Sequence, residues 1–298
     1  MKRDKAIARL SVIIALAAGA AASVGIFSSG GPGPHLHETV RGTTVTIYGQ
    51  GLYKHMSAEV APQGIAQDYI TLFVAVPELL ASLLFAVRGS LKARFILAGT
   101  LGYFLVTYLF YLMMGMYNAM FLVYAVLLSS SFFALFLTLM SFDPTELPER
   151  FGSKAPAGFA GGFLILNAAA IAFLWLGVVV PPLMDGSIIP KEVEHYTTLV
   201  VQGLDLGLLL PIAVVSGILL KRRSPFGYLF APVYLVFLSI LMIALTAKLV
   251  AMASLGFSVI PAIFIIPTLA VVSITCSAML LKQLNQYREM EHREPRRS

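Results

Sequence analysis

The chain has 298 residues, of which 58% are hydrophobic and only 12% are charged, and its formal net charge is +6. Soluble domains average about 45–50% apolar and about 25% charged residues, so half the charge that a water-facing surface needs is missing. This composition excludes most soluble enzymes, disordered proteins and ordinary nucleic-acid-binding domains. The single cysteine, Cys276, excludes a disulfide framework and a cysteine-rich metal site.

Eight apolar segments are long enough to cross a bilayer, which takes about 20 residues as a helix. They are Leu10–Phe27, Tyr69–Val87, Phe95–Gly115, Ala119–Met140, Phe159–Val180, Leu199–Leu220, Gly227–Val250 and Ile260–Leu281. Apolar runs of this length pair their backbone groups within lipid only as helices. The sequence therefore predicts an all-α transmembrane bundle, a single membrane domain over residues 1–298 with a tail at 283–298.

The basic residues divide unequally between the two sides of the predicted bundle. One side, which includes both termini, holds 17 Lys and Arg residues, and the other side holds three. Cytoplasmic loops carry such an excess, so we expect a multi-pass protein of the plasma (inner) membrane with both termini in the cytoplasm. The net charge of +6 then reflects topology, and the lipid bilayer is the expected partner rather than a nucleic acid.

The first span has an alternative interpretation. A basic start, an apolar run and the small residues 20–23 resemble a secretory signal with its cleavage site. The run is long for a signal peptide, so we expect a retained span; cleavage would leave seven spans.

The extracytoplasmic loop at 28–68 is predicted to be structured. Polar and apolar residues alternate over Thr43–Tyr48, which predicts a short strand, and Asp68 is expected to cap the second span. His35 and His37 lie two residues apart in this loop, and His195 follows the acidic Glu192–Glu194 segment in another outer loop. Imidazole and carboxylate groups suit zinc, but ordinary solvated loop residues give the same pattern, and the sequence does not show that the two loops meet.

Three ionisable residues lie inside the predicted spans, where a charge is costly and each is a functional candidate. Glu78 lies roughly 14 Å below the outer end of its helix at 1.5 Å per residue, and is either a proton carrier or a hydrogen-bonded packing residue. Asp205 shares a helix face with Gln202, which suits either a transport site or helix packing. Lys248 lies near a helix end, where it either extends to water or pairs with Asp205 or Glu78.

A row of hydroxyl groups lies along the third predicted span. Tyr103, Thr107, Tyr108 and Tyr111 fall on one helix face, which is expected to point into the bundle, with Tyr108 as a candidate site residue.

The two groups of four spans have the same orientation, so a parallel repeat of 1–145 and 159–285 is possible. A proline, a serine, an arginine and a second serine recur at offsets of 0, +5, +11 and +13 in each half. They are Pro77, Ser82, Arg88 and Ser90 in the first half, and Pro211, Ser216, Arg222 and Ser224 in the second. Two unrelated helices that each end in a basic turn at the membrane surface would also produce this pattern. If the repeat is real, the interrupted helices at Pro77 and Pro211 point to a transporter site.

Two segments, YGQGLYKHMSAEVAPQGIAQD at Tyr48–Asp68 and QGLDLGLLLPIAVVSGILLKRRSPFGY at Gln202–Tyr228, resemble parts of a group of prokaryotic polytopic membrane proteins to which no function is assigned. The resemblance covers about a sixth of the chain. It implies a multispan membrane protein and transfers no site residues.

The function favoured by the sequence is a small-solute or proton-coupled transporter that uses intramembrane carboxylates, and no cofactor is predicted. Two alternatives stay open. One is a membrane enzyme with an outer His and carboxylate site acting on a lipid-linked substrate, and the other is a non-catalytic sensor or assembly factor. The substrate and the oligomeric state do not follow from the sequence.

Overall fold

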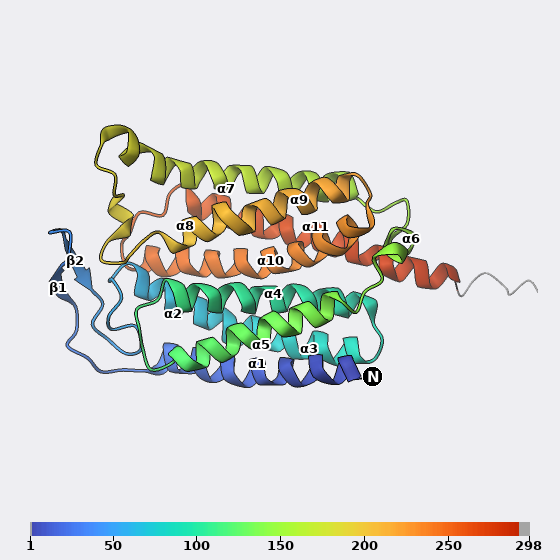
Figure 1. The fold of residues 1–298 in the computed structure, drawn as a ribbon, viewed down its shortest axis with the longest axis horizontal. Coiled ribbons are helices and arrows are strands. Elements are labelled where there is room, and N and C mark those ends of the chain that lie inside the picture. The colour runs from blue at the N-terminus through green and yellow to red at the C-terminus, as the bar shows by residue number, and fades with distance from the viewer. Residues whose placement is uncertain (1, 292–298) are drawn as a thin grey trace, which may run out of the picture.

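A computed structural model of the chain describes residues 2–291, and its architecture is a helical bundle with one small β-hairpin (Figure 1). The first half contains α1 (Lys2–Phe27), β1 (His35–Glu38), β2 (Thr44–Ile47), α2 (Val60–Ile70), the π-helical segment η1 (Thr71–Ala75), α3 (Val76–Val87), α4 (Leu91–Met113) and α5 (Phe121–Leu139). The short elements η2 (Pro144–Glu146) and α6 (Leu147–Phe151) connect the halves. The second half contains α7 (Ala157–Asp185), η3 (Lys191–Val193), α8 (Val200–Leu204), the π-helical segment η4 (Asp205–Leu209), α9 (Leu210–Lys221), α10 (Pro225–Ser254) and α11 (Ala262–Glu291).

Eight of the described helices are long and apolar enough to cross a membrane, as predicted. They are Arg3–Phe27, Val60–Val87, Leu91–Met113, Phe121–Leu139, Ala157–Asp185, Val200–Lys221, Pro225–Ser254 and Ala262–Leu284. The all-α polytopic fold is therefore confirmed. α11 continues to residue 291, and the rest of the predicted tail, 292–298, lies outside the described residues.

α4 and α10 occupy the centre of the bundle and pack against each other. α1, α3 and α5 lie on the side of α4, whereas α7, α9 and α11 lie on the side of α10 (Figure 1). The two central helices approach closely at Gly99 of α4, where an added Cβ would lie 2.4 Å from the Cβ of Val236 in α10. This position therefore has room only for glycine.

The start of the second span corrects one prediction. The helix begins at Val60, not beside Asp68, and Asp68 is inside α2 with only 2% of its surface exposed. Pro62 did not prevent this early start, because the first turn of a helix has no internal partner for the missing N–H. Asp68 is a buried residue of the bundle and not a helix cap.

The loop between α1 and α2 is structured, as predicted. β2 covers most of the expected strand and pairs antiparallel with β1, with His35 opposite Ile47 and Glu38 opposite Thr44. We call the end of the bundle that carries this hairpin the hairpin end. The opposite end, which carries the start of α1, the α3–α4 turn, α6 and the α9–α10 turn, is called the basic end (Figure 1).

Candidate functional site

Asp68 is held by two tyrosines from different parts of the chain. The hydroxyl of Tyr53, in the loop before α2, donates a 2.5 Å hydrogen bond to Oδ2, and the hydroxyl of Tyr111 in α4 donates a 3.0 Å bond to Oδ1. α1 leaves room for this arrangement at Gly25, where an added Cβ would lie 1.8 Å from Oδ2 of Asp68. The carboxyl group is thus enclosed by α1, α2, α4 and the loop.

The polar network continues from the preceding residue, Gln67. Its amide Nε2 donates to the hydroxyl of Tyr103 at 2.7 Å and to that of Thr107 at 3.2 Å, and Tyr103 also contacts the hydroxyl of Thr71 at 3.0 Å. The Oε1 atom of Gln67 is buried and has no hydrogen-bond donor. Tyr108 follows Thr107 directly in α4 and stacks on Tyr124, with ring centroids 5.7 Å apart. The hydroxyl-bearing face of α4 therefore points into the bundle, as expected.

Asp205 is the corresponding acid of the second half. It begins the π-helical segment η4, and its Oδ2 accepts a 2.7 Å hydrogen bond from the indole Nε1 of Trp175 in α7. Gln202 lies one turn earlier in α8 with a half-buried side chain. The hydroxyl of Tyr234 in α10 donates to the carbonyl of Leu209 at the end of η4, at 3.0 Å.

Lys248 in α10 lies within electrostatic range of both Asp205 and Asp68. Asp68 lies eight residues from the start of α2, Asp205 five residues from the start of α8, and Lys248 six residues from the end of α10. At a rise of 1.5 Å per residue, all three lie about 8–12 Å from the hairpin end of their helices. The structure thus gathers one lysine and two carboxyl groups at a common depth, and we call these residues the charged triad.

Glu78 lies elsewhere along the bundle. It is nine residues before the end of α3, so it lies about 14 Å from the basic end of its helix. Its Oε1 accepts a 3.3 Å hydrogen bond from Thr100 in α4, and its side chain is half-buried. The structure brings Lys248 close to Asp205 and Asp68, but it places Glu78 at a different depth from Asp205.

Pro77 and Pro211 occupy equivalent positions in the two halves. Each is the second residue of a 12-residue α-helix, α3 or α9, and each of these helices follows a five-residue π-helical segment. In both halves the N–H of the residue before the proline bonds the carbonyl five residues back, from Val76 to Thr71 and from Leu210 to Asp205. Single π-helical turns of this kind occur frequently at functional sites.

The structure joins the two outer loops at the hairpin end. Arg41 donates to the carbonyl oxygens of Glu194 at 3.0 Å and Tyr196 at 2.9 Å, and the backbone N–H of Ser57 donates to the Tyr196 hydroxyl at 3.2 Å. We call this contact between residues 39–59 and 193–196 the loop clasp. It holds the two outer loops together at the hairpin end of the bundle.

The candidate metal ligands meet only in part. His37 and His195 lie with ring centroids 6.1 Å apart, but Nε2 of His195 contacts the carbonyl of His55 at 3.0 Å, and Nδ1 of His35 contacts that of Gly33 at 2.9 Å. The part of the chain that the structure describes contains no group of three or more His, Cys, Asp or Glu side chains that could hold a metal ion.

Burial changes the acid–base properties of the loop clasp. It raises the pKa of Glu194 and of Glu59 above their ordinary values, and it lowers the pKa of His195. Nδ1 of His195 and Oε2 of Glu194 are buried without a hydrogen-bond partner. The clasp therefore contains several groups whose protonation depends on whether the loops are docked.

No protein-family model matches the chain, and no curated protein or solved structure matches it either. The resemblance inferred from Tyr48–Asp68 and Gln202–Tyr228 thus stays a prediction. The structure itself establishes a multi-pass membrane protein with eight candidate spans.

Asp68 of the charged triad, and Tyr53 and Trp175, which donate to its two carboxylates, were not predicted as site residues. Asp68 was missed because its helix starts nine residues earlier than hydropathy indicated. Tyr53 is a loop residue whose role depends on folding back into the bundle, and no local pattern reveals it. Trp175 carried one signal, since it is the sole tryptophan of the chain and lies mid-span.

Proposed function

We propose that the protein is a proton-coupled transporter of a small solute, with the charged triad as its coupling site. The observation that carries this proposal is that Lys248 lies within electrostatic range of a carboxyl group of each half, Asp68 and Asp205, inside the membrane-spanning region. Ionisable residues within membrane spans are costly and usually mark ion or substrate pathways.

The net charge of the triad explains how proton binding would be coupled to transport. With all three groups ionised, Asp68, Asp205 and Lys248 together carry one negative charge, and binding of one proton makes the triad neutral. A neutral site is much cheaper to enclose in a low-dielectric region than a charged one. Proton binding then favours a change of conformation in which the site opens to the other side of the membrane.

The surrounding residues would serve this cycle in defined ways. Tyr53 and Tyr111 donate to Asp68, and Trp175 donates to Asp205, so each carboxylate is stabilised while it is ionised. Gln202 and Tyr108 are candidates to line the solute path beside the triad. Glu78, nearer the basic end, is the candidate acceptor for the proton on that side.

The π-helical segments before Pro77 and Pro211 would allow the two halves to move against each other. Interrupted helices at corresponding positions of two repeats are common at transporter sites, where one half moves against the other. The prolines are exposed on the bundle surface, so a change at the π-helical segments would not need to break buried packing around the prolines themselves.

Proton binding can be tested without knowing the solute. The protein is reconstituted into liposomes on a solid-supported membrane, and the transient current after a rapid pH change is recorded. We expect a charge displacement that Asp205→Asn and Asp68→Asn largely abolish, because each variant removes one proton-binding carboxylate of the triad.

Two comparisons complete this experiment. Asp185→Asn, at the exposed end of α7, should retain the wild-type current, and Glu78→Gln tests whether Glu78 contributes a separate part of the displaced charge. Wild-type currents in well-folded Asp205→Asn and Asp68→Asn proteins, as judged by gel filtration, would overturn the proposal.

The enzymatic alternative has one supporting observation, the approach of His37 to His195. We do not propose it, because the His195 ring already binds the His55 carbonyl. A non-catalytic role as a sensor or assembly factor would predict no charge displacement in the same experiment.

A further inference from the structure

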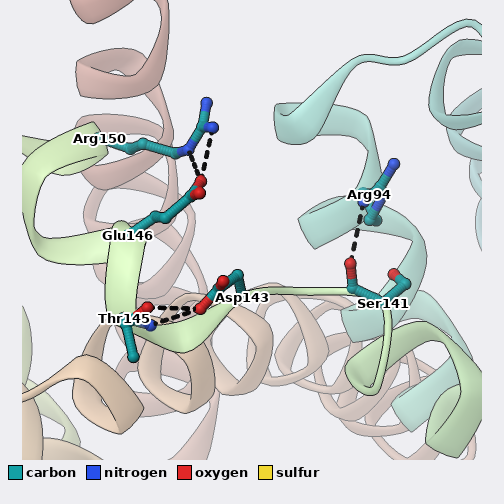
Figure 2. A network of polar contacts seen from close by, with 6 residues as sticks. All are labelled: Arg94, Ser141, Asp143, Thr145, Glu146 and Arg150. Atoms are coloured by element: carbon teal, nitrogen blue, oxygen red, sulfur yellow. Dashed lines mark hydrogen bonds and ion pairs between the residues drawn. The ribbon is translucent and has the colours of Figure 1, made fainter.

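A polar pocket lies at the basic end, far from the charged triad. Its volume is about 270 Å³, and it is formed where α4 begins, where the chain leaves α5, and by η2 and α6. Arg94 and Arg150 both line it and lie on opposite sides of the view in Figure 2, where the chain from Ser141 to Thr145 connects the two sides.

Arg94 has hydrogen-bonding capacity left for a ligand. Its guanidinium donates one 3.3 Å hydrogen bond, to the carbonyl of Ser141, and lies 5.9 Å from the ring centre of Phe142. A guanidinium has five N–H donors arranged as a planar fork that matches phosphate oxygens. Both Arg94 and Phe142 line the pocket, with the guanidinium over the Phe142 ring.

The two acidic residues that line the pocket, Asp143 and Glu146, already accept hydrogen bonds from neighbouring residues. Oε2 of Glu146 accepts hydrogen bonds from Nη2 and Nε of Arg150 at 2.7 and 3.0 Å. Oδ1 of Asp143 accepts from the hydroxyl of Thr145 at 2.6 Å and from its backbone N–H at 3.0 Å, and these two bonds lower the pKa of Asp143. Both carboxylates thus accept hydrogen bonds from neighbouring residues of their own segment. Neither of them is a hydrogen-bond partner of Arg94, which lies on the opposite side of the pocket.

The start of α4 adds to the positive potential. The helix is 23 residues long, and Leu91, its first residue, lines the pocket. The N-terminal end of a helix carries a partial positive charge and attracts phosphate groups.

The location identifies the source of the ligand. The pocket lies level with Leu91 and just beyond Leu139, the first and last residues of two spans, so it is at the depth of the lipid headgroups. Its volume is below the roughly 300–1,000 Å³ of pockets for drug-sized molecules, which suits a headgroup better than a whole solute.

We propose that this pocket binds a phosphate group, supplied by the headgroup of an anionic phospholipid, with Arg94 as the main ligand. Lipid binding there would hold α4 to the η2–α6 connection between the two halves. The proposal is independent of the charged triad and of any transport activity.

Native mass spectrometry of the full-length protein tests this inference. The protein is titrated with phosphatidylglycerol or phosphatidylcholine, and the dissociation constant of the tightest bound lipid is measured. We expect wild type to prefer phosphatidylglycerol, and Arg94→Gln to weaken that binding about tenfold, as expected for the loss of a charge-assisted hydrogen bond.

The matched control is Arg222→Gln, which removes the same charge at an exposed turn of the basic end. It should leave phosphatidylglycerol binding unchanged. If Arg94→Gln fails to fold, Arg94→Lys is measured in its place. Lysine keeps the charge but lacks the planar fork of N–H donors, so this variant should bind phosphatidylglycerol severalfold more weakly.

The outcomes separate the two phosphate sources. Binding that millimolar inorganic phosphate does not displace supports the lipid headgroup, whereas displacement would overturn the lipid assignment. Unchanged phosphatidylglycerol binding in well-folded Arg94→Gln or Arg94→Lys protein would overturn the site altogether.

Discussion

At the scale of single residues, the Asp68 pocket depends on the absence of a side chain at Gly25. An alanine there would place its Cβ 1.8 Å from Oδ2 of Asp68 and 3.1 Å from the hydroxyl of Tyr53. Real atoms do not approach so closely, so Gly25→Ala must displace the carboxyl group or α1. We expect destabilisation of about 1–3 kcal/mol, the usual cost of overpacking, measured as a lower thermal unfolding midpoint.

Gly19→Ala is the matched control for Gly25→Ala. It lies in the same helix, α1, and an added Cβ there would meet no atom within 4 Å. The control should leave the unfolding midpoint unchanged or slightly raise it, because alanine is the better helix former. Equal midpoints for the two variants would contradict the packing of α1 against Asp68.

The contact between Gly25 and Asp68 also concerns whether the first span is retained or cleaved. α1 packs against α2, α3 and α5, and Gly25 forms part of the wall around Asp68. Retention of the first span stays a prediction, and loss of α1 by cleavage would remove this wall of the Asp68 pocket.

At the scale of elements, the loop clasp is the contact most sensitive to pH. The pKa of His195 is lowered below 6.5 by burial, so the docked loops bind its proton less tightly than the undocked loops do. Docking by this group is therefore favoured above about pH 6.5 and is weakened as pH falls through that value. The acids act in the opposite direction, because burial raises the pKa of Glu59 and Glu194 from 4.5.

Hydrogen exchange of residues 186–199 can isolate the histidine contribution. We expect the protection factors of wild type, corrected for intrinsic exchange, to fall between pH 7.5 and 6, and we expect a smaller fall in His195→Gln. Glu194→Gln, which keeps His195, should retain at least the wild-type fall. The same pH dependence in His195→Gln and in wild type would show that another group governs docking.

The elements differ in how far the sequence predicted them. The spans were predictable because long apolar runs must be helical in lipid, and β2 because its residues alternate. The early start of α2 was not, since residues 60–68 include Pro62, Gln67 and Asp68 and lack a hydrophobic signature. The π-helical segments depend on which carbonyl each N–H selects, a difference of one residue that hydropathy does not encode.

At the scale of the whole molecule, we propose that the two halves derive from a duplication. An offset of 134 residues relates Pro77 to Pro211, and it also superimposes η1 on η4 and α3 on α9. Ser90 and Ser224 cap α4 and α10 in the same way, each accepting a hydrogen bond from the N–H three residues later. The spacing in the sequence suggested this repeat, and the matching π-helical segments now support it.

The offset also describes how the halves differ. It places Asp68 at the position of Gln202, and Thr71 at the position of Asp205. Each half therefore carries one acid and one neutral polar residue, one turn apart and in opposite order. The charged triad of Asp68, Asp205 and Lys248 exists only when both halves are assembled, and neither half alone predicts it.

A double-mutant cycle between Asp205 and Lys248 tests the central claim, that Lys248 interacts with the triad carboxylates. The free energies of unfolding are measured for Asp205→Asn, Lys248→Met and the double variant. We predict a coupling free energy of about 1 kcal/mol or more, since Lys248→Met leaves both carboxylates without a compensating charge, and Asp205→Asn then removes one of these uncompensated charges. The parallel cycle of Glu78→Gln with Lys248→Met should be additive. Additivity within about 0.5 kcal/mol for Asp205 and Lys248 would contradict the charged triad.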